Sequence, residues 1–326
     1  MRAIVAENFG PPESFAIKEL PSRPPGPGQV RAAVRFAGVS FVDILVPAGK
    51  HQFKPDLPFI SGTEFSGQVL EVGDGVTNFA PGDLVCGGNM GGMFAEEVTL
   101  PAARMQKIPA GAPLDAAAIL RASYLTSWYA LVERGFVAQG EFVLVLGAAG
   151  AVGIAAVQIA KLFGATVIAS ASSAAKREFA LAHGADHAVD TNAADWREQV
   201  KTLTGGHGLD IVVDPVGGEA TERAFRALAY KGRHLVVGFA TGTIPSLPVN
   251  LPLLKGASLI GVLASYVDRD PALSARLRRQ IMECFAAGQL RPPVGRVYPF
   301  EAFTSAMQDL QQGETLGRVL LQFTPS

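Results

Sequence analysis

The pattern of apolar and polar positions changes near residue 116. Before it, short alternating stretches are separated by turns rich in glycine and proline, such as the run at 21–28. Such a pattern predicts short strands of a partly open barrel. We place these strands at residues 2–5, 14–19, 30–39, 64–72 and 84–85.

Beyond residue 116, apolar positions at helical spacing alternate with short continuous apolar runs. This alternation predicts an α/β domain with a doubly wound parallel sheet. The expected strands are 142–146, 165–169, 209–214, 234–238 and 258–263. The tail, with a helix at 271–287 and strands at 296–299 and 318–323, does not extend this alternation. We therefore expect the tail to return to the first domain, with a cleft between the two domains.

Three glycines follow the apolar run 142–146, at Gly147, Gly150 and Gly153. The first permits a sharp turn off the strand, the second a close approach of backbone to a pyrophosphate, and the third close packing of helix on strand. The triplet also fits a packing-driven helix start or a membrane segment. The residues Gln158 and Lys161 in the helix disfavour the membrane, and the flanking strands favour a dinucleotide site.

The segment 170–177 lies at the distance from the first glycine where NAD-selective sites have an Asp or Glu. In those sites the acid binds the ribose hydroxyls. It contains no Asp or Glu, but it holds Ser172, Lys176 and Arg177. Hydroxyls and cations suit a 2′-phosphate, so the sequence favours NADPH. The two cations also fit the solvated face of the next helix.

The bulk properties exclude several classes. The chain has 326 residues, enough for two domains, and a net charge of −1 from 28 basic and 29 acidic residues. We therefore expect no nucleic-acid or membrane partner. Cys86 and Cys284 suggest neither a disulfide framework nor a zinc site. The chain opens directly on a strand pattern without a signal peptide, and we expect a cytoplasmic protein.

Seven motifs point to a known family. They lie at residues 38–43 (GVSFVD), 62–67 (GTEFSG), 82–85 (GDLV), 147–153 (GAAGAVG), 214–218 (DPVGG), 237–240 (VGFA) and 317–321 (GRVLL). On these motifs the chain resembles the zinc-independent medium-chain dehydrogenase/reductases, specifically the quinone oxidoreductase and quinone-oxidoreductase-like branch. The resemblance implies a GroES-like barrel domain, residues 1–121 and 265–326, and a Rossmann NADPH-binding domain, residues 122–264.

Departures from the zinc-dependent branch concern the metal. Zinc alcohol dehydrogenases have Cys where this chain has Ser40, and His where it has Thr63, and they carry a cysteine cluster that is missing here. A catalytic zinc needs about three ligands of the Cys, His or carboxylate type. The resemblance therefore implies no metal and an acceptor that is already electron-poor, a quinone or an activated alkene.

The resemblance also assigns positions around the cofactor. Ser40 and Thr126 match residues near the nicotinamide, and Phe239 and Leu263 match positions that flank it. The matches to the pyrophosphate turn and to the 2′-phosphate contacts are Ala149, Gly150, Ala151, Val152, Ser172 and Lys176. Thr191 stands where relatives often have a Tyr on that phosphate, so this contact is weaker here.

His51 occupies the position of a tyrosine that donates a proton in related enoyl thioester reductases. A histidine there is able to polarise an acceptor or protonate a carbanion. The polar loop 46–57 equally suits a histidine without a role. Ser40 and His51 are therefore the candidate catalytic residues.

Three functions stay open. The first is an NADPH:quinone oxidoreductase. The second is an NADPH-dependent enone or enoyl reductase, acting for example on an enoyl thioester or a 2-haloacrylate. The third is a non-catalytic NADPH-binding protein, as some relatives are. We also expect a homodimer through the apolar strand 258–263, because apolar sheet edges are normally paired or covered. The identity of the acceptor, and transfer of one or two electrons, are not decided by the sequence.

Overall fold

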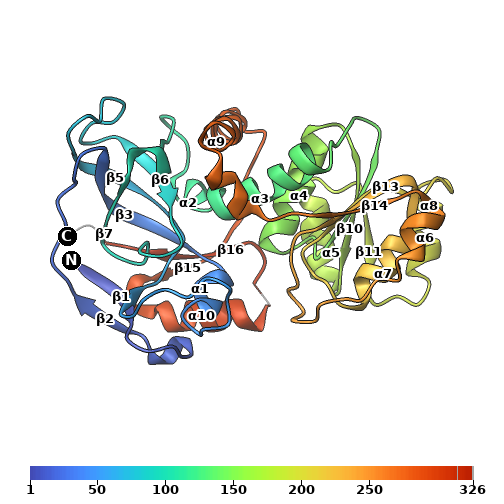
Figure 1. The fold of residues 1–326 in the computed structure, drawn as a ribbon, viewed down its shortest axis with the longest axis horizontal. Coiled ribbons are helices and arrows are strands. Elements are labelled where there is room, and N and C mark those ends of the chain that lie inside the picture. Colours follow the sequence, from blue (N-terminus) through green and yellow to red (C-terminus); the bar gives the residue numbers. More distant parts are fainter. Residues whose placement is uncertain (314, 325–326) are drawn as a thin grey trace. The chain divides into compact units, whose positions relative to one another are not determined.

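The computed structural model describes residues 1–313 and 315–324 and divides the chain into two compact units (Figure 1). The barrel unit is Met1–Ala122 with Arg291–Ser326, and the Rossmann unit is Ser123–Leu290. None of the helices within the described ranges is long and apolar enough to cross a membrane.

The barrel unit consists mainly of antiparallel strands. In one sheet the order is β2-β1-β4, and in the other β15-β16-β3-β5-β6-β8, with β7 also paired to β3. The strands are β1 (Arg2–Ala6), β2 (Ala16–Glu19), β3 (Gln29–Val39), β4 (Phe59–Ile60), β5 (Glu64–Val72), β6 (Leu84–Gly88), β7 (Glu97–Pro101), β8 (Met105–Lys107), β15 (Val294–Pro299) and β16 (Arg318–Gln322). The helices are α1 (Val42–Leu45), α2 (Leu114–Ala117) and α10 (Phe303–Gln312).

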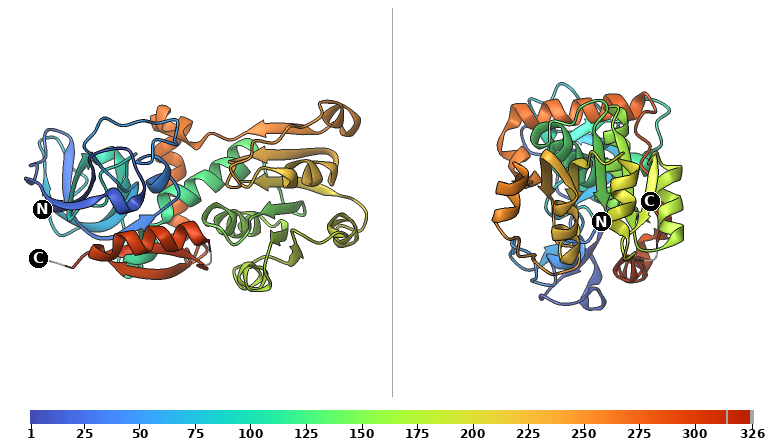
Figure 2. Two further views of the ribbon diagram at one scale, coloured as in Figure 1. Left: turned by 90° about the horizontal axis from the view of Figure 1, so that it is seen from below. Right: turned by 90° about the vertical axis from the view of Figure 1, so that its right-hand side faces the viewer.

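The C-terminal strands return to the N-terminal strands, as the sequence predicts. β16 pairs antiparallel with β3, and β15 pairs with β16 (Figure 2). Phe300, Met307, Val319 and Leu321 of this tail are buried in one core with residues of the N-terminal strands. The continuous apolar run of β16 is therefore buried in the barrel unit.

The Rossmann unit has a parallel sheet in the order β11-β10-β9-β12-β13-β14 (Figure 1). The strands are β9 (Phe142–Leu146), β10 (Thr166–Ala171), β11 (His187–Asp190), β12 (Leu209–Asp214), β13 (Leu228–Val236) and β14 (Ser258–Gly261). Numbered along the chain this is 3-2-1-4-5-6, the doubly wound order of dinucleotide-binding domains. The apolar runs of β9 and β12 are buried, which is why they read as continuous rather than alternating.

Helices flank this sheet. They are α3 (Leu125–Trp128), α4 (Ala151–Leu162), α5 (Ala174–Ala182), α6 (Trp196–Leu203), α7 (Glu219–Arg226), α8 (Asn250–Lys255) and α9 (Pro271–Ala286). The helix expected after the glycine triplet corresponds to α4, and the helix expected at 271–287 corresponds to α9 within one residue. The sequence analysis does not place α7 or α8.

The boundary of the Rossmann unit lies at Leu290, whereas the sequence assigned residues 265–326 to the barrel. The difference is α9. Its face of Leu277, Ile281 and Phe285 is buried, and Arg276 forms an ion pair at 2.9 Å with Glu133 of the Rossmann unit. An amphipathic helix packs on whichever unit offers a matching surface, and its sequence alone does not name that unit.

Candidate active site and cofactor site

The glycine turn after β9 requires the absence of side chains at two positions. Gly147 has φ of 59°, and a Cβ there would lie 2.8 Å from Val216 Cγ2. A Cβ at Gly153 would lie 2.2 Å from the carbonyl oxygen of Gly147. The chain thus turns sharply off β9, and α4 packs closely against the turn.

The start of α4 leaves room for an anion. Gly150 is exposed and is the N-cap of the helix, with no side-chain hydrogen bond closing it. The first-turn N–H groups, at Ala151, Val152 and Gly153, have no acceptor within the helix. These groups and the helix dipole favour a phosphate in front of the turn that includes Ala149. The turn lies where the strand order reverses between β9 and β12, the position at which such sheets bind nucleotides.

A short helix is anchored to α4. In α3, the Ser127 hydroxyl donates to the Val152 carbonyl at 2.8 Å. The Tyr124 hydroxyl, just before α3, donates to Gln158 Oε1 at 3.0 Å. Thr126 lies between these two anchored residues and is half-buried. The two bonds fix its position relative to the glycine turn.

The segment after β10 holds the candidate 2′-phosphate residues. Ser172 is exposed, and Ser173 is the N-cap of α5, accepting from the Lys176 N–H. Arg177 is already engaged, because its Nη1 lies 2.9 Å from Asp190 Oδ2 and donates to the Ala171 carbonyl. Thr191 shares a 2.9 Å hydrogen bond with Ser170. The free cation at this site is therefore Lys176, for which the described residues provide no ion pair.

Asp190 is an acid near this site that lies outside the segment 170–177, in which the sequence shows no Asp or Glu. It lies at the end of β11, and the parallel pairing of β10 with β11 places Ala171 opposite it. Its charge is compensated by Arg177 rather than directed at a ribose. The structure thus brings together one acid and two cations where the sequence showed only the cations.

The turn after β12 is held by a buried carboxylate. Asp214 Oδ1 accepts from the N–H groups of Val216 and Gly217, both at 2.9 Å. Its Oδ2 accepts from the Thr221 hydroxyl at 2.6 Å and pairs with His234 Nε2 at 3.0 Å. Burial alone would raise the pKa of Asp214, but these hydrogen bonds outweigh it and the pKa is lowered. The sequence shows the motif at 214–218, but it does not predict that His234 pairs with Asp214.

Phe239 and Leu263 follow the strands β13 and β14. The Ala240 N–H donates to the Pro215 carbonyl at 3.0 Å, which ties the loop of Phe239 to the turn held by Asp214. A Cβ at Gly217 would lie 2.9 Å from Phe239 Cδ1, so the ring sits directly over that glycine. Phe239 and Leu263 are 40% and 44% exposed, which leaves apolar surface for a ligand at the carboxyl edge of the sheet.

A compact polar cluster in the barrel unit contains Ser40. Its backbone N–H and its hydroxyl both donate to Asp43 Oδ2, at 2.8 and 2.6 Å. The Thr63 hydroxyl reaches the same oxygen at 3.4 Å and lies 3.4 Å from Ser40 Oγ. Ser40 is half-buried, whereas Asp43 and Thr63 are buried. Ser40 and Thr63, which stand where zinc dehydrogenases have Cys and His, are thus two hydroxyl residues that both approach the carboxyl of Asp43.

Asp43 is 2% exposed, and burial raises the pKa of its carboxyl to about 7. The hydrogen bonds from Ser40 and Thr63 oppose this rise, while the nearby charge of Glu64 adds to it. Its second oxygen, Oδ1, has no hydrogen-bond partner in the described chain. The carboxyl is therefore divided between protonated and ionised forms near neutral pH.

Next to this cluster lies a buried ion pair. Arg318 Nη2 donates to Glu64 Oε1 at 2.5 Å and to the Val39 carbonyl at 3.2 Å. Glu64 Oε2 accepts from the Ala122 N–H at 2.8 Å. A Cβ at Gly38 would lie 2.8 Å from Glu64 Oε1, so glycine allows the carboxylate to approach β3. The pair joins β5 to β16 beside Val39, the last residue of β3, which Ser40 follows.

His51 lies in the loop after α1 and is half-buried. Its Nδ1 accepts from the Phe53 N–H at 3.0 Å. The pKa of the ring is lowered, chiefly because partial burial disfavours the charged form. The geometry therefore favours a neutral ring with its proton on Nε2, rather than a charged one. Within the described residues its hydrogen bond joins it to Phe53 and not to Ser40 or Asp43.

The donor set does not suit a catalytic zinc. Among residues 1–313 and 315–324, no group of three or more His, Cys, Asp or Glu side chains is placed to hold a metal ion. Cys86 is buried and Cys284 lies in the other unit. Hydroxyls are poor substitutes for the Cys and His ligands that zinc prefers.

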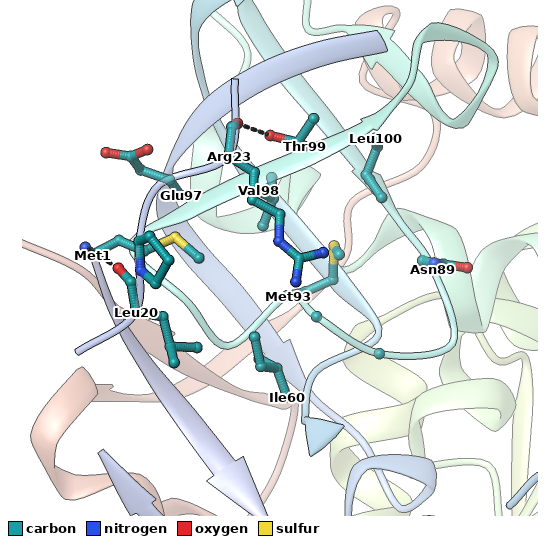
Figure 3. Close-up of a pocket in the computed structure, with 13 residues that line it drawn as sticks. Met1, Leu20, Arg23, Ile60, Asn89, Met93, Glu97, Val98, Thr99 and Leu100 are labelled. Carbon is teal, nitrogen blue, oxygen red and sulfur yellow. Dashed lines mark hydrogen bonds between the residues drawn. The ribbon is translucent and has the colours of Figure 1, made fainter. Parts of the chain in front are cut away.

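A cavity of about 300 Å³ in the barrel unit contains none of the predicted site residues (Figure 3). Its walls are mostly apolar side chains, among them Leu20, Ile60, Met93 and Leu100. The Thr99 hydroxyl closes one side by donating to the Arg23 carbonyl at 2.9 Å. We assign the cavity no part in the chemistry described above.

The fold and the two polar sites define a class, the two-domain reductases that combine a GroES-like unit with a dinucleotide-binding sheet. The alcohol dehydrogenase GroES-like domain model matches residues 26–110, and the zinc-binding dehydrogenase model matches residues 151–278. The chain is 40% identical over 310 residues to quinone oxidoreductase-like protein 2 of Bos taurus, covering 94% of this chain and 88% of that protein. It belongs to the quinone oxidoreductase-like family of medium-chain dehydrogenase/reductases, which confirms the predicted family and fold class.

Two solved structures extend the comparison. The NADPH complex of Escherichia coli quinone oxidoreductase has a TM-score of 0.90 and 25% identity, covering 99% of this chain and 100% of that chain. The CurK enoyl reductase has a TM-score of 0.89 and 25% identity, covering 99% of both chains. A protein named a quinone oxidoreductase and a protein named an enoyl reductase therefore share this fold.

Proposed function

We propose that this protein is an NADPH-dependent oxidoreductase that delivers hydride to a quinone without a metal ion. The observation that carries the proposal is the hydroxyl pair of Ser40 and Thr63 on Asp43, at the positions of two zinc ligands in metal-dependent relatives. Without a Lewis acid to polarise a carbonyl, the acceptor has to be electron-poor already. A quinone meets this condition.

The Rossmann unit supplies the cofactor site. The uncapped start of α4 at Gly150 suits the pyrophosphate, and Ser172 and Lys176 suit the 2′-phosphate. Thr126, Phe239 and Leu263 would contact the nicotinamide side. NADPH supplies the hydride when bound, and the NADPH complex of the Escherichia coli relative supports this choice of cofactor.

A second candidate function is reduction of an activated C=C bond, in an enone or an enoyl thioester. It is favoured by Asp43, a buried acid that is still partly protonated near neutral pH. Reduction of an alkene needs a proton donor at carbon or at the enolate oxygen, whereas a reduced quinone takes protons from water. The likeness to an enoyl reductase structure supports the same candidate.

The assay that separates these functions measures NADPH consumption against quinones, enones and enoyl thioesters in parallel. Turnover of quinones with little turnover of enones supports the first function, and the reverse supports the second. Tight NADPH binding without turnover of any acceptor would identify a non-catalytic NADPH-binding protein.

We also propose a homodimer joined through β14. This strand pairs with β13 and forms the end of the sheet order. The surface beside it is apolar, since Tyr230, Leu253 and Leu254 are each at least three-quarters exposed. Exposed apolar patches next to an unpaired strand edge favour association with a second copy.

A further inference from the structure

The carboxyl of Asp43 is incompletely satisfied in the folded chain. Oδ2 accepts from the Ser40 N–H, the Ser40 hydroxyl and, at 3.4 Å, the Thr63 hydroxyl. Oδ1 is buried without a partner in the described residues. A buried carboxylate with an unpaired oxygen is costly, whereas a carboxylic acid carries no net charge to desolvate. The site therefore favours the protonated acid.

The charged neighbours reinforce this preference. The negative charge of Glu64 on β5 is near enough to raise the pKa of Asp43 further. The cation on β16, Arg318, is directed to that carboxylate and to the Val39 carbonyl. Asp43 itself has no ion pair among the described residues. Glu64 is thus compensated by Arg318, whereas no ion pair within residues 1–313 and 315–324 compensates Asp43.

Ser40 provides the route from this acid towards solvent and ligand. Its Oγ lies 2.6 Å from Asp43 Oδ2, a distance at which either oxygen is able to act as the donor. Ser40 is half-buried, whereas Asp43 is buried, so Ser40 is the more accessible member of this hydrogen-bonded pair. Thr63, at 3.4 Å from both Ser40 and Asp43, is too distant to be the main route.

We propose that Asp43 is held as a neutral carboxylic acid and supplies, through the Ser40 hydroxyl, the proton that completes reduction of an activated alkene. The inference rests on the proposed oxidoreductase function and deepens its C=C-reducing form. Ser40 is the residue that touches the acceptor, and Asp43 acts through it as a positioning residue and proton reserve.

Hydride from NADPH forms a C–H bond at the β-carbon of the enone, and the electron pair of the C=C bond moves to the enolate. The Ser40 hydroxyl gives its proton to the enolate while Oγ takes the proton from Asp43 Oδ2. The products are the saturated ketone, NADP⁺ and the Asp43 carboxylate. A proton from water restores the acid through Ser40 before the next turnover.

The first test is infrared difference spectroscopy of the purified protein between pH 6 and pH 8.5, for wild type and Asp43→Asn. A protonated carboxyl C=O band that disappears at the higher pH, and that is missing in the variant, supports the neutral acid. Wild-type protein without such a band would overturn the proposal. This readout does not depend on turnover.

The second test compares the pH dependence of enone turnover in four proteins. For the wild type we expect activity to fall as pH rises through neutrality, because the donor is the protonated acid. Asp43→Asn keeps the shape of the side chain but is expected to lower turnover by about 10²-fold and to lose this pH dependence. Ser40→Ala is expected to behave in the same way, whereas Ser40→Thr, which retains a hydroxyl, keeps the pH dependence.

The matched control is Asp83→Asn. Asp83 is a surface carboxylate paired with Lys107, with a lowered pKa, and its removal leaves the pH profile unchanged. If Asp43→Asn retains the wild-type profile while the wild type reduces enones, the relay is overturned and the oxidoreductase function stands. If the wild type binds NADPH but reduces no acceptor, the proposed function falls and the relay falls with it.

Discussion

Arg177 and Asp190 form an ion pair of 2.9 Å between α5 and the end of β11. It places an acid beside the residues expected to bind a 2′-phosphate, and it occupies one of the two cations there. Asp190→Asn should therefore release Arg177 and remove a negative charge from the site. We expect NADPH to bind several-fold more tightly, in keeping with the roughly 0.2–1 kcal/mol of an exposed ion pair.

The check is titration of the variant and the wild type with NADPH and with NADH. NADH, which carries no 2′-phosphate, is expected to bind both proteins equally. Weaker binding of NADPH by Asp190→Asn would mean that Arg177 needs its partner to be positioned.

Lys176 and Ser172 are expected to bind the 2′-phosphate directly. Lys176→Ala or Ser172→Ala should weaken the binding of NADPH by roughly 1.5–3 kcal/mol, the cost of one charged hydrogen bond. The binding of NADH should be nearly unchanged. Lys201→Ala, which removes an exposed cation on α6, serves as the matched control. Equal losses for NADPH and NADH would point to a folding defect instead.

Much of the fold follows from the sequence, because buried parallel strands read as continuous apolar runs and the glycine triplet marks the turn after β9. The pairing of Arg177 with Asp190 did not follow, since it depends on β10 lying beside β11. The protonation of Asp43 was equally hidden, because it arises from burial and from Glu64 on another strand. The sequence places α9 in the barrel domain, whereas the structure places it in the Rossmann unit. An amphipathic pattern does not identify the surface on which a helix packs.

His51 is expected to matter more for enones than for quinones. A charged histidine would be a proton donor whose activity falls as pH rises through its pKa. The hydrogen bond from Phe53 and the lowered pKa favour instead a neutral ring whose Nε2–H polarises the acceptor oxygen by a hydrogen bond, while the proton itself comes through Ser40. His51→Phe should lower enone turnover by about 10²-fold with a smaller effect on quinones. Steady-state rates with both acceptors decide this, and equal rates in variant and wild type would make His51 a bystander.

The stability of the protein should depend on the ionisation of Asp43. Its pKa is about 7 in the folded chain and 3.8 ordinarily, so the folded state holds the proton more tightly. Below pH 3.8 both states are protonated and there is no penalty. Between pH 4 and pH 7 the unfolded state ionises first, and the free energy of unfolding falls with rising pH by up to a few kcal/mol. Asp43→Asn should remove this loss.

Urea denaturation at pH 5 and pH 8 measures the effect. We expect the free energies of unfolding of Asp43→Asn and the wild type to differ less at pH 5 than at pH 8. At pH 8 the variant is expected to be the more stable relative to the wild type. A constant difference between the two proteins at both pH values would show that Asp43 does not titrate in this range.

The proposed dimer predicts a mass of twice 34.1 kDa by light scattering. Leu254→Lys places a charge on the apolar surface beside β14 and should shift the protein towards the monomer. Leu181→Lys is the matched control, because Leu181 is an exposed apolar residue on α5, the helix that packs on β10 and β11. A wild type of monomer mass at micromolar concentration would contradict the dimer.

The central claim is metal-free hydride transfer from NADPH, and its most direct test is NADPH oxidation by chelator-treated protein whose zinc content has been measured. We predict consumption of NADPH with a quinone or an enone, at a rate that neither the chelator nor added zinc changes, by protein with far less than one zinc per chain. Activity that is lost with zinc and restored by its return would contradict the account.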